Sequence, residues 1–107
     1  MARERKIGDP YEEGVAAGPV INNSQMERIL GYIQSGKDQG ATLEVGGERL
    51  DRKGYFIQPT IFSGVTDEMK ISQEEIFGPV MSVLKFSTVE EAIKRANDSI
   101  YGLAGGV

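Results

Sequence analysis

Residues 80–96 read VMSVLKFSTVEEAIKRA and combine two apolar patterns from which we infer the class of fold. The first part is apolar except for Ser82 and Lys85, which is typical of a strand covered on both faces. The second part repeats apolar side chains at helical spacing, and Thr88 and Glu91 have the spacing of a capping box at a helix start. A strand that leads directly into a helix predicts an α/β architecture.

A second helix is predicted nearer the N-terminus. Ser24 and Glu27 have the spacing of a capping box, in which each side chain accepts a hydrogen bond from the other residue's backbone. Apolar side chains then recur at i, i+3, i+4 and i+7, namely Met26, Ile29, Leu30 and Ile33. We expect Gly36 or Gly40 to end this helix, because glycine adopts the left-handed conformation at low cost.

Short strands are predicted between these two helices. Residues 41–45 alternate as a strand does, and a pair of glycines follows them. Residues 55–57 and 61–62 are also strand-like, but Pro59 lacks the N–H that a strand ladder requires, so we expect two short pieces. Residues 66–72 are predicted to form one helical turn.

Length and composition fit one soluble globular domain. The chain has 107 residues, 39% of them hydrophobic, enough for one modest core, so we assign residues 1–107 to one domain. The 16 acidic and 12 basic residues argue against a nucleic-acid partner. Apolar runs are shorter than the roughly 20 residues that span a bilayer, and no signal-peptide pattern is present. We therefore expect no membrane partner and a cytoplasmic location.

The absence of cysteine and histidine restricts the chemistry that these residues can perform. It excludes a thiolate nucleophile, a Ser-His-Asp triad and zinc sites built from thiolates or imidazoles. Asp9, Glu12 and Glu13 lack the spacing of a calcium loop and are interpreted as a solvated acidic turn, so no metal site is assigned. The 14 glycines contain no phosphate-binding G-x-G-x-x-G pattern. We assign no catalytic residue in this chain.

The adjacent carboxylates of Glu74 and Glu75 are the first binding candidates. As neighbours they diverge in a strand or a helix, so they are no catalytic dyad; they are either solvated or capping groups, or one of them contacts a ligand. A carboxylate accepts two hydroxyl hydrogen bonds well, as in ribose recognition. Phe77, two residues after Glu75, would lie on the same face of an extended backbone. The alternative for Phe77 is a place in the core.

Three motifs carry a resemblance to a known family: GYFIQPT at 54–60, EEIFGPV at 74–80 and YGLA at 101–104. They closely resemble the NAD(P)-dependent aldehyde dehydrogenase superfamily, and EEIFGP is strongly specific for it. The similarity covers essentially the whole chain and is nearest to the branch that oxidises retinal and small aliphatic aldehydes. The fold that it implies is a partial α/β catalytic domain, with helices packed on a mainly parallel sheet and incomplete at both ends.

The resemblance also implies an activity for the intact enzyme. Members of the superfamily oxidise an aldehyde to a carboxylic acid by hydride transfer to NAD or NADP, through a cysteine thioester, with a glutamate as general base. In the family both of those residues lie upstream of the segment matched here. We therefore expect an internal piece of the enzyme, whose partners are the remaining parts of the enzyme or its subunits. Relatives of this kind imply the cytoplasm or, alternatively, the mitochondrial matrix.

The resemblance assigns cofactor-binding roles to four residues. Glu75 resembles the glutamate that accepts hydrogen bonds from the nicotinamide ribose, and Phe77 resembles the aromatic residue beside the nicotinamide. Gln25 occupies a position near the adenosine side of the cofactor, and Leu103 one that lines the nicotinamide pocket. Arg28 stands where relatives often have lysine, which keeps the charge but changes the donor geometry.

Two functional hypotheses follow for the chain by itself. In the first, it supplies cofactor-positioning and scaffold residues and is inactive alone. In the second, it is a truncated interaction module whose strand edges pair with full-length subunits. Under either hypothesis the isolated chain exposes apolar surface that other parts of the enzyme would cover, so we expect it to be molten or oligomeric.

Overall fold

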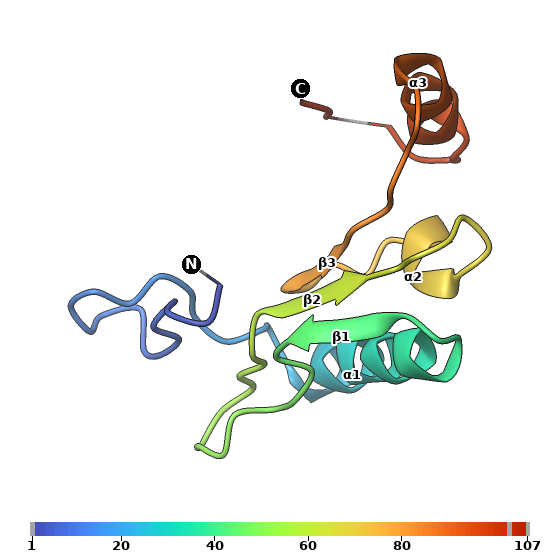
Figure 1. The fold of residues 1–107 in the computed structure, drawn as a ribbon. Coiled ribbons are helices and arrows are strands. Elements are labelled where there is room, and N and C mark those ends of the chain that lie inside the picture. The colour runs from blue at the N-terminus through green and yellow to red at the C-terminus, as the bar shows by residue number, and fades with distance from the viewer. Residues whose placement is uncertain (1, 103, 107) are drawn as a thin grey trace.

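The computed structural model describes residues 2–102 and 104–106. Helices and strands alternate in part along the chain, in the order α1 (Asn23–Asp38), β1 (Thr42–Val45), β2 (Thr60–Ser63), α2 (Lys70–Gln73), β3 (Val80–Ser82) and α3 (Val89–Asn97). Figure 1 shows α1 running beneath the sheet, whereas α3 stands apart from it at the end of an extended segment. The expected α/β class is confirmed for this part of the chain.

The three strands form a mixed sheet in the order β1-β2-β3. β1 pairs with β2 antiparallel, because residues 46–59 return the chain through a loop that contains no helix. β2 pairs with β3 in parallel, with Thr60 opposite Val80, and α2 lies in the connection between them. The expectation of a mainly parallel sheet is therefore wrong for the described residues, where one pairing of each kind is present.

β3 is shorter and more open than the sequence predicts. Only Val80–Ser82 form the strand, although the Val83 N–H still donates to the Phe62 carbonyl at 2.9 Å. Met81 is 58% exposed, so the strand is not covered on both faces by the described residues. Its apolar run predicts burial that these residues alone do not provide, because α1 covers the sheet on one side only (Figure 1).

α1 has a side-chain cap at its N-terminus and a glycine after its C-terminus, but the N-terminal cap is not the predicted residue. The Asn22 side chain accepts a hydrogen bond from the Gln25 N–H at 2.8 Å, so the helix starts earlier than a cap at Ser24 would allow. At the other end Gly40 follows with φ +91°, as predicted. Gly36 lies inside the helix, where an added Cβ would lie 3.0 Å from Ile71 Cδ1. This glycine lets α1 approach α2 closely.

The core lies between α1 and the sheet. Phe62, at the middle of β2, is fully buried and packs with the apolar face of α1. The buried cluster comprises Met26, Ile29, Tyr32, Ile33, Ala41, Ile57, Phe62, Val65, Met69, Ile71 and Ile76. All four residues of the apolar stripe predicted for the first helix belong to this core or pack against it. The stripe therefore fixes which side of α1 faces the sheet.

Two smaller expectations need adjustment. Residues 55–57 form no strand of their own, although Ile57 pairs with Arg49 in an isolated bridge. α2 begins at Lys70, later than predicted, after Met69, whose side chain makes no capping hydrogen bond. The Lys70 N–H donates instead to Gln39 Oε1, just beyond the end of α1, at 2.9 Å. A tertiary contact thus replaces the local cap.

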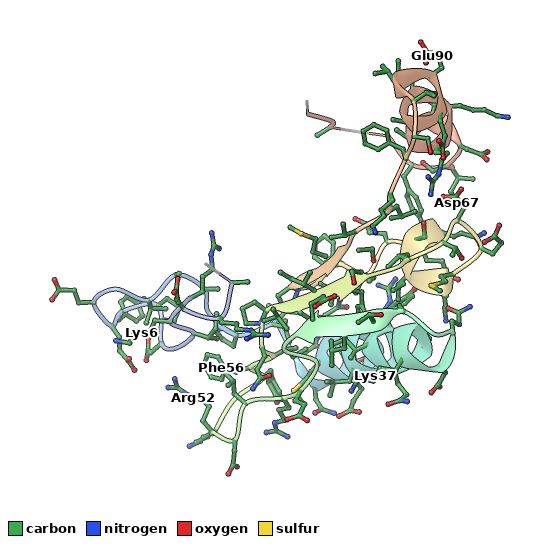
Figure 2. The ribbon with its side chains drawn as sticks, in the orientation of Figure 1. Lys6, Lys37, Arg52, Phe56, Asp67 and Glu90 are labelled. Atoms are coloured by element: carbon green, nitrogen blue, oxygen red, sulfur yellow. The ribbon has the colours of Figure 1, made fainter. Side chains whose placement is uncertain are left out.

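α3 is capped as predicted but packs differently. Thr88 Oγ1 accepts from the Glu91 N–H, while Glu91 accepts from the Ser87 N–H at 2.8 Å, and this latter bond holds the pKa of Glu91 below its usual range. Arg95 binds Asp67 at 2.8 Å, on the loop between β2 and α2 (Figure 2), and this bond raises the pKa of Arg95. No residue of α3 is buried. Among the described residues, α3 is tethered to the sheet but not packed on it.

We predict that the apolar face of α3 drives self-association of the isolated chain. Val89 and Ile93 are 64% and 59% exposed. Replacing both with serine should reduce the weight-average mass in sedimentation velocity at equal concentration, because less apolar surface seeks cover. The control is Ile21→Ser, which removes a single, more exposed side chain outside the apolar face of α3 and should leave association unchanged. A wild-type chain that sediments as a monomer at every concentration would contradict the prediction.

Candidate functional site

Residues 74–78 form an irregular segment that follows α2 along the chain, precedes β3 and lies against α1. Three polar side chains of α1 reach this segment: Gln25, Arg28 and Tyr32. Their spacing of i, i+3 and i+7 places them along one face of the helix. The helix thus presents a row of hydrogen-bond donors to a segment that has no secondary structure of its own.

Consecutive backbone carbonyls of the segment accept hydrogen bonds from this row. Arg28 Nη2 donates to the Glu75 carbonyl at 2.9 Å. Gln25 Nε2 donates to the Phe77 carbonyl at 2.9 Å and lies 3.4 Å from the Ile76 carbonyl. Because a backbone carbonyl without a partner is costly once shielded from water, these bonds specify one path for the segment.

Tyr32 anchors the start of the segment. Its hydroxyl donates to Glu74 Oε2 at 2.7 Å, and Arg28 Nη2 donates to the same hydroxyl at 3.5 Å, which raises the pKa of Arg28. The Arg28 guanidinium lies 5.5 Å and Lys70 Nζ 4.9 Å from the centre of the Tyr32 ring. The ring itself is buried, so its hydroxyl is held in place from the core.

The segment also makes apolar contacts with the core and with α1. Ile76 is buried in the core cluster. Gly78 lies so close to α1 that an added Cβ would be 2.5 Å from Ile29 Cδ1. Between them Phe77 has φ +54°, a left-handed conformation that is uncommon outside glycine and is held by its surroundings. The bond from Gln25 to the Phe77 carbonyl is one of those surroundings.

This arrangement leaves the side chains of Glu75 and Phe77 exposed to solvent. The Phe77 ring is 73% exposed, so the core alternative for this residue is wrong in the described chain. Glu75 is exposed too, and its carboxylate makes no hydrogen bond or salt bridge within residues 2–102 and 104–106. The backbone leaves the extended region at Phe77, so the prediction that strand-like alternation places the Glu75 and Phe77 side chains on one face does not hold.

The other assigned residues lie as follows. Gln25 is brought to the segment, with its amide nitrogen bound to the Phe77 carbonyl. Its amide oxygen makes no hydrogen bond in the part of the chain that the structure describes, so an acceptor remains there for a ligand. Leu103 lies outside the described residues. Glu74 is the residue that caps the C-terminus of α2, and its own N–H donates to the Lys70 carbonyl.

Sequence reasoning missed the part played by Tyr32. Its aromatic ring belongs to the apolar side of the predicted helix, and nothing in the pattern marks its hydroxyl as a donor to a residue 42 positions away. The helical spacing of Gln25, Arg28 and Tyr32 is the one signal that could have grouped them. The sequence marks Arg28 for its charge and its donor geometry, but does not predict that it donates to the Glu75 carbonyl.

Other features of the described residues do not form a competing site. Within them, no helix is long and apolar enough to cross a membrane, and no group of three His, Cys, Asp or Glu side chains is placed to hold a metal ion. An open hollow of about 440 Å³ lies between the N-terminal residues and β1, lined in part by Arg3, Glu44 and Pro59. It includes none of the residues of segment 74–78. Segment 74–78, together with the α1 side chains that bind it, is therefore the candidate site.

Comparison with known proteins identifies the family. Residues 1–107 match the model of the aldehyde dehydrogenase family, and the chain belongs to it. It is 57% identical over 106 residues to the mitochondrial aldehyde dehydrogenase family 2 member B4 of Arabidopsis thaliana, and 53% identical to rat cytosolic aldehyde dehydrogenase 1. These matches cover 99% of the chain but only 20% and 21% of the relatives. The chain thus spans about a fifth of their length.

Solved structures agree with this assignment. The NAD+ complex of aldehyde dehydrogenase from Bacillus cereus superimposes with a TM-score of 0.93 at 52% identity, covering 96% of this chain and 21% of that protein. The aldehyde dehydrogenase of Mycobacterium tuberculosis complexed with NAD+ superimposes with a TM-score of 0.92 at 44% identity, covering 95% and 22%. The small α/β unit described above is therefore part of the aldehyde dehydrogenase fold.

We predict that Gly78→Ala destabilises the segment, because its Cβ would clash with Ile29. Overpacking of this kind costs roughly 1–3 kcal/mol and should lower the thermal midpoint of the full-length protein, measured by circular dichroism. The control is Gly31→Ala on the exposed side of α1, where a Cβ meets nothing within 4 Å. It should leave the midpoint unchanged or raise it, since alanine favours helix. Equal midpoints for Gly78→Ala and wild type would refute the close contact.

Proposed function

We propose that the intact protein containing this chain is an NAD(P)-dependent aldehyde dehydrogenase. It would convert an aldehyde, water and NAD(P)+ into a carboxylic acid, NAD(P)H and a proton, by way of a cysteine thioester. The observation that carries this proposal is the family match along residues 1–107. In this reaction the nicotinamide cofactor supplies the hydride acceptor. NAD+ is the form bound in the two solved relatives.

The chain's own contribution is to bind and orient the cofactor. The carboxylate of Glu75, which makes no hydrogen bond in the described chain, suits a ribose, because two acceptor oxygens can receive two neighbouring hydroxyls. The exposed ring of Phe77 offers a flat apolar surface to the nicotinamide. The unbonded amide oxygen of Gln25 suits a hydroxyl on the adenosine side, and Leu103 is assigned to the nicotinamide pocket by the resemblance. The donor row on α1 keeps the loop ordered before the cofactor arrives.

The same proposal makes the isolated chain inactive. The 107 residues contain no cysteine, so the nucleophile must come from elsewhere in the intact protein. The remaining parts of the enzyme are thus the chain's partners, together with the aldehyde and the cofactor. We place the enzyme in the cytoplasm or, alternatively, the mitochondrial matrix. The names of the relatives include cytosolic and mitochondrial members.

The test is NADH formation from acetaldehyde or retinal by the full-length protein and by the 107-residue chain. We expect turnover only from the full-length protein. Glu75→Gln should raise the KM for NAD+ about tenfold, because a charged acceptor for the ribose hydroxyls becomes a neutral one. The control is Glu68→Gln, which alters an exposed carboxylate with no hydrogen bond in the described chain and should leave the KM for NAD+ unchanged. Turnover by the isolated chain, or none by the full-length protein, would refute the proposal.

An alternative role as an interaction module is favoured by one observation, the open edge of the sheet. β3 is an edge strand, and the exposed side chains of Met81, Val83 and Phe86 continue from it toward α3. Unpaired backbone groups on such an edge can pair with another chain.

If the chain acts in this way, it should co-purify at a fixed ratio with a tagged full-length subunit. Ser82→Pro, which removes a backbone N–H on the open side of β3, should abolish the association, because the N–H of the next residue, Val83, faces β2 instead. Ser99→Pro, which lies outside the helices and strands, is the matched control. Absence of co-purification of the wild-type chain would remove this alternative.

A further inference from the structure

We propose that Tyr32 is a positioning residue for the cofactor contact of Glu75, and that it acts through the carboxylate of the neighbouring Glu74. The inference rests on the proposed function, because it assumes that Glu75 holds the cofactor ribose. It adds a residue that contacts neither cofactor nor substrate. Its starting observation is the 2.7 Å hydrogen bond from the Tyr32 hydroxyl to Glu74 Oε2.

The first step of the argument is the rigidity of the donor. Tyr32 is only 7% exposed and belongs to the core cluster between α1 and the sheet. A ring packed in this way has few rotamers open to it, so its hydroxyl is a fixed point at the rim of the core. The cations of Arg28 and Lys70 lie near the ring and limit its movement further.

The second step is the place of Glu74 in the chain. It stands directly before Glu75, at the end of α2, where regular structure stops. A side-chain bond at this point fixes where the irregular segment begins. The bond joins a phenol to a carboxylate, a pairing that is shorter and stronger than a bond between neutral groups.

The third step is that Glu75 is fixed from both sides. Tyr32 holds the residue before it, while Arg28 donates to the Glu75 carbonyl on the other side of its Cα. The Tyr32 hydroxyl also accepts from Arg28, so the two anchors form one network. With the backbone held in this way, the Glu75 side chain projects to the exterior as a preorganised acceptor.

A purely structural role for the same bond predicts a different result. If Tyr32 only stabilised the end of α2, losing its hydroxyl would lower the melting temperature and leave the kinetic constants of the folded enzyme unchanged. A positioning role predicts a selective effect on the cofactor. The aldehyde should be unaffected, since nothing in this network is assigned to its binding.

The experiment uses the full-length protein with NAD+ and acetaldehyde. We expect Tyr32→Phe, which keeps the buried ring, to raise the KM and Kd for NAD+ about three- to tenfold and leave the KM for acetaldehyde unchanged. Tyr11→Phe is the matched control, because Tyr11 is 99% exposed and its hydroxyl has no partner in the described residues. It should behave as wild type.

A second pair of variants tests the route through Glu74. Glu74→Ala should reproduce the effect of Tyr32→Phe, and the double variant should be no worse than either single one, because both remove the same bond. Glu74→Gln keeps an acceptor oxygen and should recover part of the NAD+ affinity. These variants also carry the test if Tyr32→Phe lowers stability, since Glu74 lies on the surface.

The outcomes separate the two proposals. If Glu75→Gln weakens NAD+ binding but Tyr32→Phe and Glu74→Ala do not, the positioning role is overturned and the proposed function stands. Additive effects of Tyr32→Phe and Glu74→Ala would also overturn it, because they would show two independent contributions. If the full-length wild type forms no NADH, the proposed function fails, and the inference that rests on it fails too.

Discussion

The contact between one face of α1 and residues 74–78 is the constraint on which the proposed site depends. Gln25, Arg28 and Tyr32 satisfy the polar groups of a segment that would otherwise be free to move, and Ile29 forms the apolar floor beneath Gly78. The helix that contributes four residues to the core is therefore also the helix that shapes segment 74–78. Core packing and loop geometry are properties of the same element, so a change in how α1 sits on the sheet reaches Glu75 directly.

Local rules predicted much of this fold from the sequence. The apolar stripe of α1, the glycine after its end and the Thr88 cap of α3 were all predicted correctly, because each depends on residues within a few positions of one another. The cap of α1 was misplaced because Asn22 and Ser24 are both good caps, and only the backbone decides between them. The mainly parallel sheet that the family resemblance implies is wrong for the described residues, and local pattern could not correct it, because a short apolar run does not say which neighbour it will pair with.

The features of the candidate site also fall into two groups: those that the local sequence predicts and those that depend on contacts between distant residues. Glu75 and Phe77 were found from their chemistry and from the family motif, both of which can be read along the chain. The Tyr32–Glu74 bond joins residues far apart in sequence, and the left-handed φ of Phe77 is imposed by its contacts. Neither follows from local pattern. The exposed apolar side chains of β3 and α3 show a second limit of sequence patterns, because their apolar pattern predicts burial that the described residues do not provide.

The strands lie side by side in the same order in which they occur along the chain. Each strand therefore meets its partner as soon as it is made: β2 folds back on β1, and β3 joins β2 after the single turn of α2. These connections, residues 46–59 and 64–79, close at an entropic cost that grows only slowly with length, and domains often begin to fold from the N-terminal side during synthesis. On the ribosome, the sheet and α1 can assemble before α3 emerges, so segment 74–78 can take shape early, while α3 is still being made.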